Sequence, residues 1–326
     1  MALLSNSLRE LLSTQGEIKP QLHSQPLFVT GCMRSGTTLL VNKLSQHPQL
    51  LKIGFELNQV WTEIGHAPCG SLECTFMENH NASFDAAFQM TNYFSDSIEA
   101  SKSLKRTVMR AYNSYKLQEG RIFYDWKQVI PVNKSPHLIN KIGFINTLFP
   151  ESKIILIIRD IYGQSASQKF HFEDYYKSTG IYNTMISKHN ECWNLTKTSS
   201  EGSYPGNFSS IPKMWLRLNQ CAIEAIKRIP ESQRIIIRYE DLIENQPEVL
   251  SKVFEHLNLN AKHQSQTNKI ISRISSFKNT TTKGDPLKKW MTQLKEEEIA
   301  SIDTVTQQEE YNLIEAFIQE NNILSK

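Results

Sequence analysis

The stretch "PLFVTGCMRSGTTLLVNKL" at residues 26–44 joins a short apolar run, a segment bounded by two glycines and a run with helical periodicity. This order predicts a buried strand, a tight loop and a helix whose N-terminus offers backbone N–H groups to an anion. The nucleotide-triphosphatase pattern G-x-x-x-x-G-K-[ST] requires a lysine at position 37, where this chain has Thr37. A cation stands earlier in the loop as Arg34. An arginine there can contact a phosphate and an adjoining leaving group, so the loop suits a donor with one phosphate that carries a group to be lost, and no metal is essential for it.

Further apolar runs are short, rich in β-branched residues and non-alternating, as in strands buried on both faces. They are "KIILIIR" (153–159), "RIIIRY" (234–239) and the weaker "QVIPVNKS" (128–135), and a helical pattern follows each of them. This βαβ alternation predicts an α/β fold, a doubly wound parallel sheet flanked by helices. No repeat or domain boundary is evident, so we predict a single domain over 1–326 with helical insertions, notably at about 55–125.

Residues 178–212 are rich in Ser, Asn, Thr, Gly and Pro and show little periodicity. They predict a long surface loop, and such loops inside a compact domain are often lids or binding loops. The segment is therefore a candidate cover for a substrate, with a disordered insertion as the open alternative.

Composition excludes several classes of protein. The chain has 36 Lys and Arg against 33 Asp and Glu, a net charge of +3, which does not indicate a nucleic-acid partner. No run of apolar residues is long enough to span a membrane, and the N-terminus lacks the apolar core of a signal peptide, so we expect a cytoplasmic protein. The five cysteines are odd in number and lack C-x-x-C pairs, which predicts reduced thiols and no metal site.

Two of these segments resemble one family. The loop "TGCMRSGTTLL" (30–40) is similar to the 5′-phosphosulfate loop of sulfotransferases that use 3′-phosphoadenosine 5′-phosphosulfate (PAPS), and "SKIILIIRDIYGQSASQ" (152–168) is similar to their 3′-phosphate site. Weaker likenesses lie at 133–153, which resembles the branch with bacterial and tyrosylprotein members, and at 235–259, which resembles the family's Y-E-D-L segment. The resemblance implies that the sheet is of the P-loop type, with the phosphosulfate loop and its helix at 25–60 and the 3′-phosphate site within 127–170.

The resemblance also implies which residues bind the donor. Those for the 5′-phosphosulfate are Arg34, Ser35, Gly36, Thr37 and Thr38, and those for the 3′-phosphate are Arg159 and Ser167. An arginine at the end of a strand and a hydroxyl in the following helix can meet one phosphate dianion. Tyr239 is a candidate contact for the nucleotide, and "SSFKNTTTKGDPLKKW" (275–290) loosely resembles the last donor-binding loop, with Ser275, Lys278 and Lys283 as candidates.

Sulfuryl transfer needs positive charge at the departing phosphate and a base for the acceptor's proton. Arg34 and Lys134 are the candidate cations, because Lys134 precedes Arg159 at about the distance that the family keeps. Glu56 aligns with the family's glutamate base, with one extra residue after "HP". His137 is the alternative base, although Pro136 occupies the family's histidine position. We interpret His171 as a surface residue.

The sequence therefore predicts a PAPS-dependent sulfotransferase that transfers a sulfuryl group to a hydroxyl or amine of a small molecule, a natural product or carbohydrate, and leaves 3′,5′-adenosine bisphosphate (PAP). The alternatives are a degenerate P-loop kinase or nucleotide hydrolase, and a non-catalytic nucleotide-binding module. "FHFEDYY" (170–176) sets two acids among aromatic residues and suits a cationic or polyhydroxylated acceptor, or forms plain helix surface. The identity of the acceptor and the oligomeric state stay open.

Overall fold

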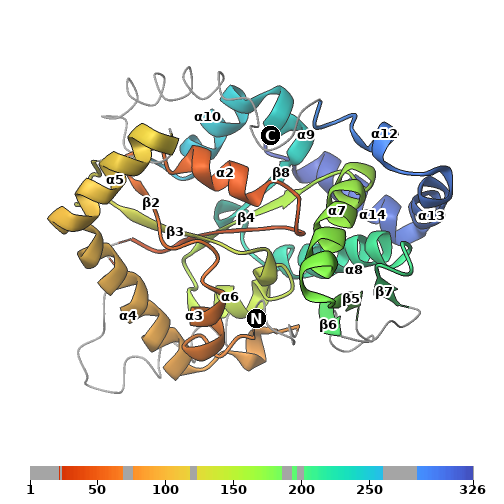
Figure 1. Ribbon diagram of the computed structural model, residues 1–326. Coiled ribbons are helices and arrows are strands. Elements are labelled where there is room, and N and C mark those ends of the chain that lie inside the picture. Colours follow the sequence, from red (N-terminus) through yellow and green to blue (C-terminus); the bar gives the residue numbers. More distant parts are fainter. Residues whose placement is uncertain are drawn as a thin grey trace.

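The computed structural model describes residues 22, 24–68, 76–117, 123–185, 193–196, 202–259 and 285–325. Its centre is a five-stranded sheet in the order β2-β3-β1-β4-β8 (Figure 1), and every neighbouring pair is parallel. The strands are β1 (Leu27–Thr30), β2 (Leu50–Lys52), β3 (Ile130–Lys134), β4 (Lys153–Ile158) and β8 (Arg234–Arg238). The predicted α/β fold is confirmed, and the four expected strands all form.

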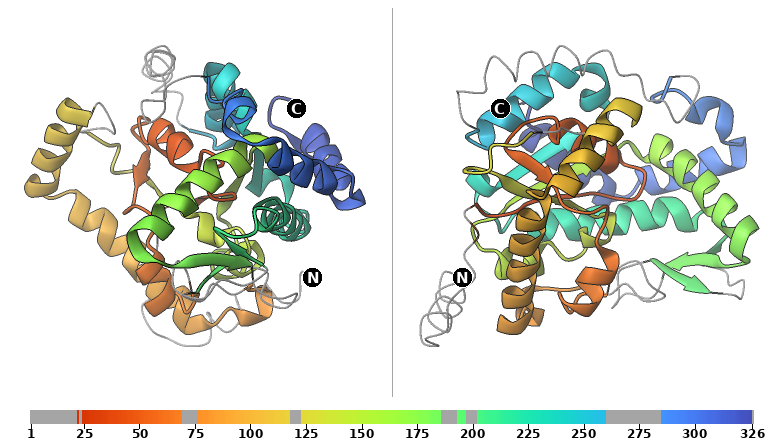
Figure 2. Two further views of the ribbon diagram at one scale, coloured as in Figure 1. Left: turned by 45° about the vertical axis from the view of Figure 1, so that its right-hand side comes forward. Right: turned by 60° about the vertical axis from the view of Figure 1, so that its left-hand side comes forward.

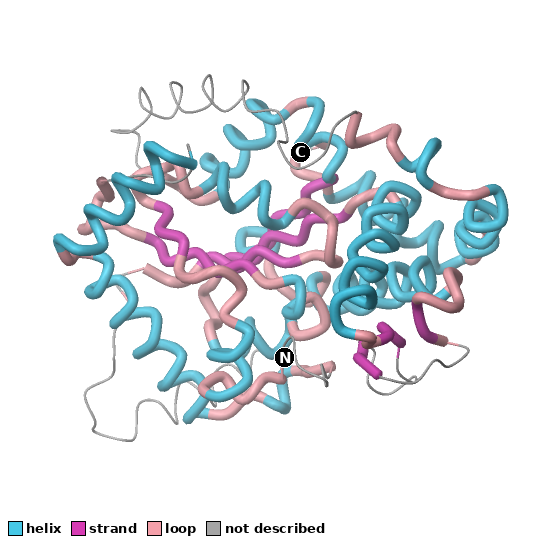
Figure 3. The backbone as a smooth tube through the Cα atoms, viewed as in Figure 1, coloured by secondary structure: helices cyan, strands magenta, loops and turns pink. Residues whose placement is uncertain are grey.

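Both faces of the sheet are buried, which explains why its strands are apolar without alternation. In β4, Ile155 and Ile157 pack into the core beneath α2 and α10, whereas Ile154, Leu156 and Ile158 pack into the opposite core. The first face is covered by α2 (Thr37–Leu44), α9 (Tyr239–Glu244) and α10 (Gln246–His256), and the second by α4 (Phe84–Ser101), α6 (Ile142–Leu148) and α8 (Ser210–Ile226). Figure 3 shows the strands as a central layer between these helices.

The strand order places the loops of interest together. β1 lies between β3 and β4, with Val29 opposite both Lys134 and Ile155. The order β2-β3-β1-β4-β8 reverses direction at β1, and folds of this kind bind ligands at the carboxyl ends of the strands beside such a reversal. Residues that directly follow β1, β3, β4 and β8 therefore meet at one edge.

Part of the insertion at about 55–125 is helical. Its described elements are α3 (Asn58–Glu63), the one-turn helix η1 (Asn79–Asn81), α4 and α5 (Leu104–Leu117), and α4 and α5 lie along the β2 side of the sheet (Figure 2). Phe94 of α4 packs edge-on against Phe28 of β1 and Phe149, with ring centroids 6.1 Å and 5.8 Å away. These contacts anchor the insertion to the core.

The prediction of a long loop at 178–212 is wrong for the residues that the structure describes in this range. Helix α7 (Ile161–Thr179) ends at Gly180, and β5 (Tyr182–Met185), β6 (Trp193–Thr196) and β7 (Ser203–Tyr204) form an antiparallel sheet in the order β6-β5-β7. The hydroxyl of Tyr204 donates a hydrogen bond to Glu173 of α7 at 2.6 Å, which ties this sheet to the helix. Strands of two to four residues are too short to produce a readable period.

The described chain closes with helices that pack beside α7 and α8. They are α12 (Trp290–Gln293), α13 (Glu296–Thr306) and α14 (Glu309–Asn321). Two one-turn helices lie earlier in the chain: η2 (Pro136–Leu138) precedes α6, and η3 (Glu231–Gln233) precedes β8. After α14, the Ile323 N–H donates to the carbonyl of Ile236 at 2.9 Å and extends the β8 edge. Among the described helices, none is both long enough and apolar enough to cross a membrane.

Candidate functional site

The loop after β1 has the backbone of an anion-binding turn. Gly31, Arg34 and Gly36 have φ angles of 157°, 68° and 91°, so the chain turns sharply between β1 and α2. A Cβ on Gly31 would lie 2.2 Å from the carbonyl oxygen of Ile157, so only glycine fits there. Gly36 is the N-cap residue of α2, and no side chain caps this end of the helix. The backbone N–H groups of Thr37 and Thr38, in the first turn, can therefore bind an anion.

Two guanidinium groups meet at this loop. Arg34 Nε donates to Ser167 Oγ of α7 at 3.1 Å, and Arg159 Nη1 donates to the backbone oxygen of Arg34 at 3.1 Å. Burial and the neighbouring charge of Arg159 lower the pKa of Arg34, and Tyr239 partly offsets this. No carboxylate of the described residues forms an ion pair with either guanidinium. Such a pair of like charges favours a bound anion.

Arg159 is held from several sides. Its Nη2 donates to the carbonyl of Pro286 at 3.0 Å, and its Cζ lies 4.5 Å from the ring centroid of Tyr239. Gly163 makes room for it, because a Cβ there would approach Arg159 Nη2 to 2.9 Å. Within the described chain, Arg159 Nε and Ser35 Oγ are buried without a hydrogen-bond partner. Both can donate to a phosphate oxygen, so the residues present fit a phosphorylated ligand.

Tyr239 lies directly against the loop. A Cβ on Gly36 would lie 2.5 Å from a ring carbon of Tyr239, so the ring covers the backbone at the start of α2. Burial raises the pKa of the Tyr239 hydroxyl, and the charges of Arg159 and Arg34 oppose that shift. The structure therefore brings Arg34, Gly36, Arg159 and Tyr239 together, whereas Ser167 reaches this group through Arg34.

A second charged group joins Lys134, the last residue of β3, to Glu56, which lies in the segment after β2. Lys134 Nζ pairs with Glu56 Oε1 at 2.6 Å, with 1% of the lysine side chain and 22% of the glutamate side chain exposed. Burial lowers the pKa of Lys134, and the hydrogen bond and charge of Glu56 act in the opposite direction. The ring of Phe55 lies 4.1 Å from the same ammonium. Lys134 is thus held by one carboxylate and one aromatic face.

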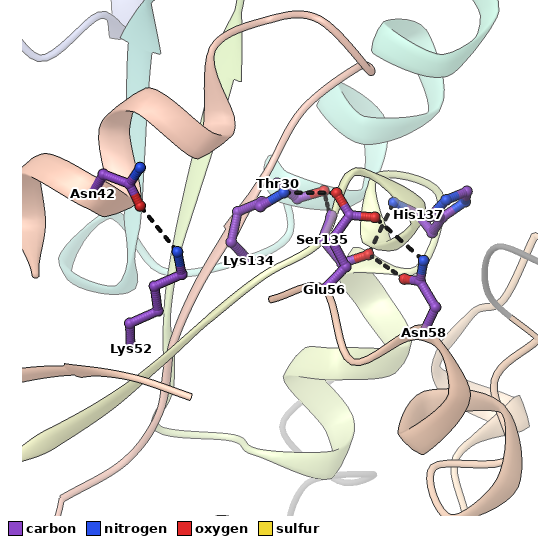
Figure 4. A network of polar contacts seen from close by, with 8 residues as sticks. All are labelled: Thr30, Asn42, Lys52, Glu56, Asn58, Lys134, Ser135 and His137. Carbon is purple, nitrogen blue, oxygen red and sulfur yellow. Dashed lines mark hydrogen bonds and ion pairs between the residues drawn. The ribbon is translucent and has the colours of Figure 1, made fainter. Parts of the chain in front are cut away.

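Neighbouring side chains fix the carboxylate in this pair (Figure 4). Asn58 Nδ2 donates to Glu56 Oε2 at 3.2 Å, and Ser135 Oγ donates to Asn58 Oδ1 at 3.1 Å. Thr30 Oγ1 donates to the carbonyl of Ser135 at 3.0 Å and so ties this network to β1. Both oxygens of Glu56 therefore accept hydrogen bonds.

His137 lies close by in sequence but faces elsewhere. It is buried in η2, where its N–H donates to Ser135 Oγ at 3.2 Å and its carbonyl accepts from Lys141 Nζ at 3.1 Å. In Figure 4 its ring points away from the pair of Lys134 and Glu56. Proline at position 136 begins this one-turn helix and shifts the histidine away from the ammonium.

Helix α7 also carries His171, which the sequence analysis interpreted as a surface residue. His171 stands four positions after Ser167, on the same helix face, and is half-buried rather than a surface residue. The i, i+4 spacing from Ser167 was the available signal. Phe55, Asn58 and Gly163 were also missed, because nothing in their local sequence indicates contact with the distant charged residues.

Residues 170–176, which set two acids among aromatic residues, form only part of the expected acceptor surface. Phe172 is buried and Glu173 is engaged by Tyr204, while Asp174 is exposed and pairs loosely with Lys177 at 3.9 Å. Ser275, Lys278 and Lys283 lie outside the described residues.

Comparison with known proteins gave one match to a family. The profile of the sulfotransferase family matches residues 26–263. No curated protein matches the chain.

Several solved structures are similar to this chain. The sulfotransferase domain from the curacin biosynthetic pathway is 18% identical, with 87% of this chain and 98% of that chain covered and a TM-score of 0.45. The sulfotransferase STF9 from Mycobacterium avium is 12% identical, with 92% and 80% covered and a TM-score of 0.46. The mouse sulfotransferase SULT7A1 in complex with PAP is 11% identical, with 91% and 89% covered and a TM-score of 0.42.

With PAP as the probe of the nucleotide site that the sequence predicts, replacing Gly36 by alanine should weaken binding by about tenfold or more, because the new Cβ meets the Tyr239 ring and displaces the loop. Gly180→Ala is the matched control, since Gly180 also has a positive φ, of 69°, but has no atom within 4 Å of the position of a Cβ. It should cost about 1 kcal/mol of folding stability and leave PAP binding intact. Titration calorimetry and urea unfolding measure both effects, and equal PAP affinity in the two variants contradicts the expectation.

Proposed function

Because this chain belongs to the sulfotransferase family, whose profile matches residues 26–263, we propose that it transfers a sulfuryl group from PAPS to a hydroxyl or amine of a small-molecule acceptor. The acceptor is a natural product or carbohydrate, and PAP is the second product. The observation that carries the proposal is the set of unsatisfied donors at the carboxyl end of the sheet. Ser35 Oγ and Arg159 Nε lack partners within the described chain, next to two guanidinium groups without a carboxylate.

In this proposal the loop and its neighbours bind the donor. The start of α2 and the side chains of Arg34 and Ser35 hold the 5′-phosphosulfate, and Arg159 holds the 3′-phosphate. Ser167 supports Arg34 through the bond to its Nε, and Tyr239 covers the loop beside the nucleotide. Charge-assisted hydrogen bonds to phosphate are among the stronger polar contacts in proteins, so these groups supply donor affinity.

Lys134 and Glu56 carry out the transfer step. The Lys134 ammonium stabilises the negative charge that develops on the departing phosphate oxygen. Glu56 accepts the proton of the acceptor as the new oxygen–sulfur or nitrogen–sulfur bond forms. Because Lys134 occupies one oxygen of Glu56 in this structure, the carboxylate becomes a better proton acceptor once the ammonium turns to the donor.

Two rival functions are less well supported. A P-loop kinase or hydrolase needs a lysine at position 37 and a carboxylate free to bind magnesium after a neighbouring strand. Thr37 starts α2, Arg159 follows β4, and Asp160 accepts the N–H of Gly163 as the N-cap of α7. A non-catalytic nucleotide-binding module has no use for the buried pair of Lys134 and Glu56 beside the loop. Buried ion pairs are a weak source of stability, so a pair retained at this edge favours a catalytic role.

The function is tested by turnover of labelled PAPS against a panel of alcohols, phenols, sugars and amines in buffer with EDTA. We expect transfer to at least one acceptor without added magnesium, together with binding of PAP and no binding of ATP. Loss of all activity with chelator and its return with magnesium would remove the assignment of phosphate neutralisation to Arg34 and Lys134.

Arg159→Ala should weaken PAPS binding by more than about tenfold, since a hydrogen bond to a charged group contributes about 1.5–3 kcal/mol. Ser167→Ala should have a smaller effect, because its hydroxyl contacts Arg34. Adenosine 5′-phosphosulfate lacks the 3′-phosphate and serves as the control donor, whose affinity should not change. Similar losses for both donors indicate that Arg159 supports the loop through Arg34 and Pro286 and does not bind the phosphate.

Glu56→Gln should lower turnover by about 10²–10⁴-fold, because the amide keeps the shape of the side chain and loses its proton affinity. PAPS affinity should barely change. His137→Ala is the control and should have a modest effect, since the ring of His137 points away from the pair. Abolished turnover in His137→Ala, with Glu56→Gln close to wild type, would reverse the assignment of the base.

A further inference from the structure

A pair of carboxyl groups lies directly behind the arginine that follows β4. Pairing of β4 with β8 sets Ile158 opposite Arg238, and Asp160 and Glu240 stand two positions beyond these partners. Glu240 Oε1 accepts a hydrogen bond from the backbone N–H of Asp160 at 3.1 Å, and only 12% of the Glu240 side chain is exposed. The starts of α7 and α9 are thus joined by a carboxyl group that no step of the proposed reaction uses.

This hydrogen bond holds one side of the peptide between Arg159 and Asp160. On the other side, Trp215 Nε1 of α8 donates to the carbonyl oxygen of Arg159 at 3.0 Å, and Trp215 is fully buried. Both polar atoms of the peptide are therefore bound by side chains of other elements, and rotating it would leave a buried polar group without a partner. The direction in which the Arg159 side chain leaves the backbone thus depends on Glu240 and Trp215.

Asp160 brings negative charge close to the same arginine. Its Oδ1 accepts the N–H of Gly163 at 2.8 Å, as the N-cap of α7. A Cβ on Gly163 would lie 2.6 Å from Asp160 Oδ2 and 2.9 Å from Arg159 Nη2, so both groups lie next to this glycine. A negative charge on Glu240 adds to that of Asp160 and opposes the binding of an anion at Arg159.

The carboxyl group of Glu240 faces one anion, Asp160, and one cation, Arg238. Arg238 Nε lies 3.5 Å from Glu240 Oε2, but half of the arginine side chain is exposed, and Oε2 accepts no hydrogen bond from the described residues. The charge of Arg238 also lowers the pKa of Glu315 of α14, which burial raises. Burial and the charge of Asp160 raise the pKa of Glu240 to about 7, and backbone hydrogen bonds partly oppose this. Glu240 therefore carries a proton in part of the molecules at neutral pH.

We propose that Glu240 is a positioning residue for the donor nucleotide, and that Glu240 takes up a proton when the nucleotide binds at Arg159. The neutral carboxyl group still accepts the N–H of Asp160 through its carbonyl oxygen, so the peptide stays in place. Protonation removes one negative charge from the surroundings of the phosphate. The inference rests on the proposed binding of PAPS and PAP at Arg159, and it adds a coupling between donor affinity and pH.

The sign of this coupling follows from the charges. A phosphate beside Arg159 makes a negative charge on Glu240 less favourable and raises the pKa of Glu240 further. PAP should therefore bind most tightly below about pH 7, where Glu240 is already neutral, and more weakly as the pH rises through the pKa values of the free and the bound protein. A rise of about half to one pKa unit corresponds to about threefold to tenfold in affinity.

Glu240→Gln separates the charge of this side chain from its shape, because the amide oxygen can accept the Asp160 N–H while the side chain stays neutral at every pH. At about pH 8.5 this variant should bind PAP about threefold to tenfold more tightly than wild type, and at about pH 6 the two proteins should bind PAP equally. Glu240→Ala lacks the acceptor and should bind PAP about fivefold to tenfold more weakly than Glu240→Gln at both pH values. Glu244→Gln, at an exposed glutamate of α9, is the control and should match wild type.

Calorimetry in buffers of different ionisation enthalpy measures the protons exchanged on binding. At neutral pH, wild type should take up a fraction of a proton more than Glu240→Gln, which is the blank for the phosphates of PAP, whose second pKa is about 6. Equal proton exchange in the two proteins overturns the proposal. So does weaker binding of PAP by Glu240→Gln than by wild type at every pH, since a merely structural role of Glu240 gives that result.

A measurement without ligand separates this inference from the proposed function. The backbone amide NMR signal of Asp160 should move with pH around neutrality in wild type and stay in place in Glu240→Gln, because the carboxyl group that accepts this N–H titrates only in wild type. Absence of that titration overturns the inference even if PAP binds. If the signal titrates but wild type does not bind PAP, the donor assignment is overturned, and the proton uptake with it.

Discussion

The contact between Arg159 and the loop after β1 is the interaction on which the rest of the site depends. Through its hydrogen bond to the carbonyl of Arg34, it joins the end of β4 to the loop and holds two positive charges together. Gly163 and Gly36 permit this packing, because a Cβ on either would collide with Arg159 or Tyr239. The protein thus sustains a charge repulsion between Arg34 and Arg159 that binding of an anion would relieve.

The two halves of the site differ in how their charges are compensated. The guanidinium groups of Arg34 and Arg159 have no carboxylate partner among the described residues, whereas Lys134 is neutralised by Glu56 at 2.6 Å. The pairing of β1 with β3 sets Lys134 opposite Val29, so the backbone of this lysine lies beside the strand that leads into the loop. In the proposed reaction, the charge of the donor competes with Glu56 for Lys134, whereas Arg34 and Arg159 have no carboxylate to release among the described residues.

Some elements of the fold could be predicted from the sequence, because they depend only on residues that are close together in the chain. The strand at 153–158 and the turn after β1 follow from β-branched runs and from glycines at 31 and 36. Other features depend on distant partners. The three residues of β2 pair with β3 about eighty positions away, and the small sheet after α7 is held by Tyr204 and Glu173. No local pattern predicts such contacts.

The sequence by itself determined the parallel α/β fold, the glycine-bounded loop after β1 and the residues that end the strands, because strand and helix periods and glycine conformations are local properties. Tertiary structure alone decided which of those residues meet. It directed the face of α7 that carries Ser167 toward Arg34, whereas the orientation of His137 follows from Pro136 and from local bonds to Ser135 and Lys141. Packing of α7 against the loop depends on contacts across more than a hundred residues, as between Arg34 and Ser167, and these contacts exist only in the folded chain.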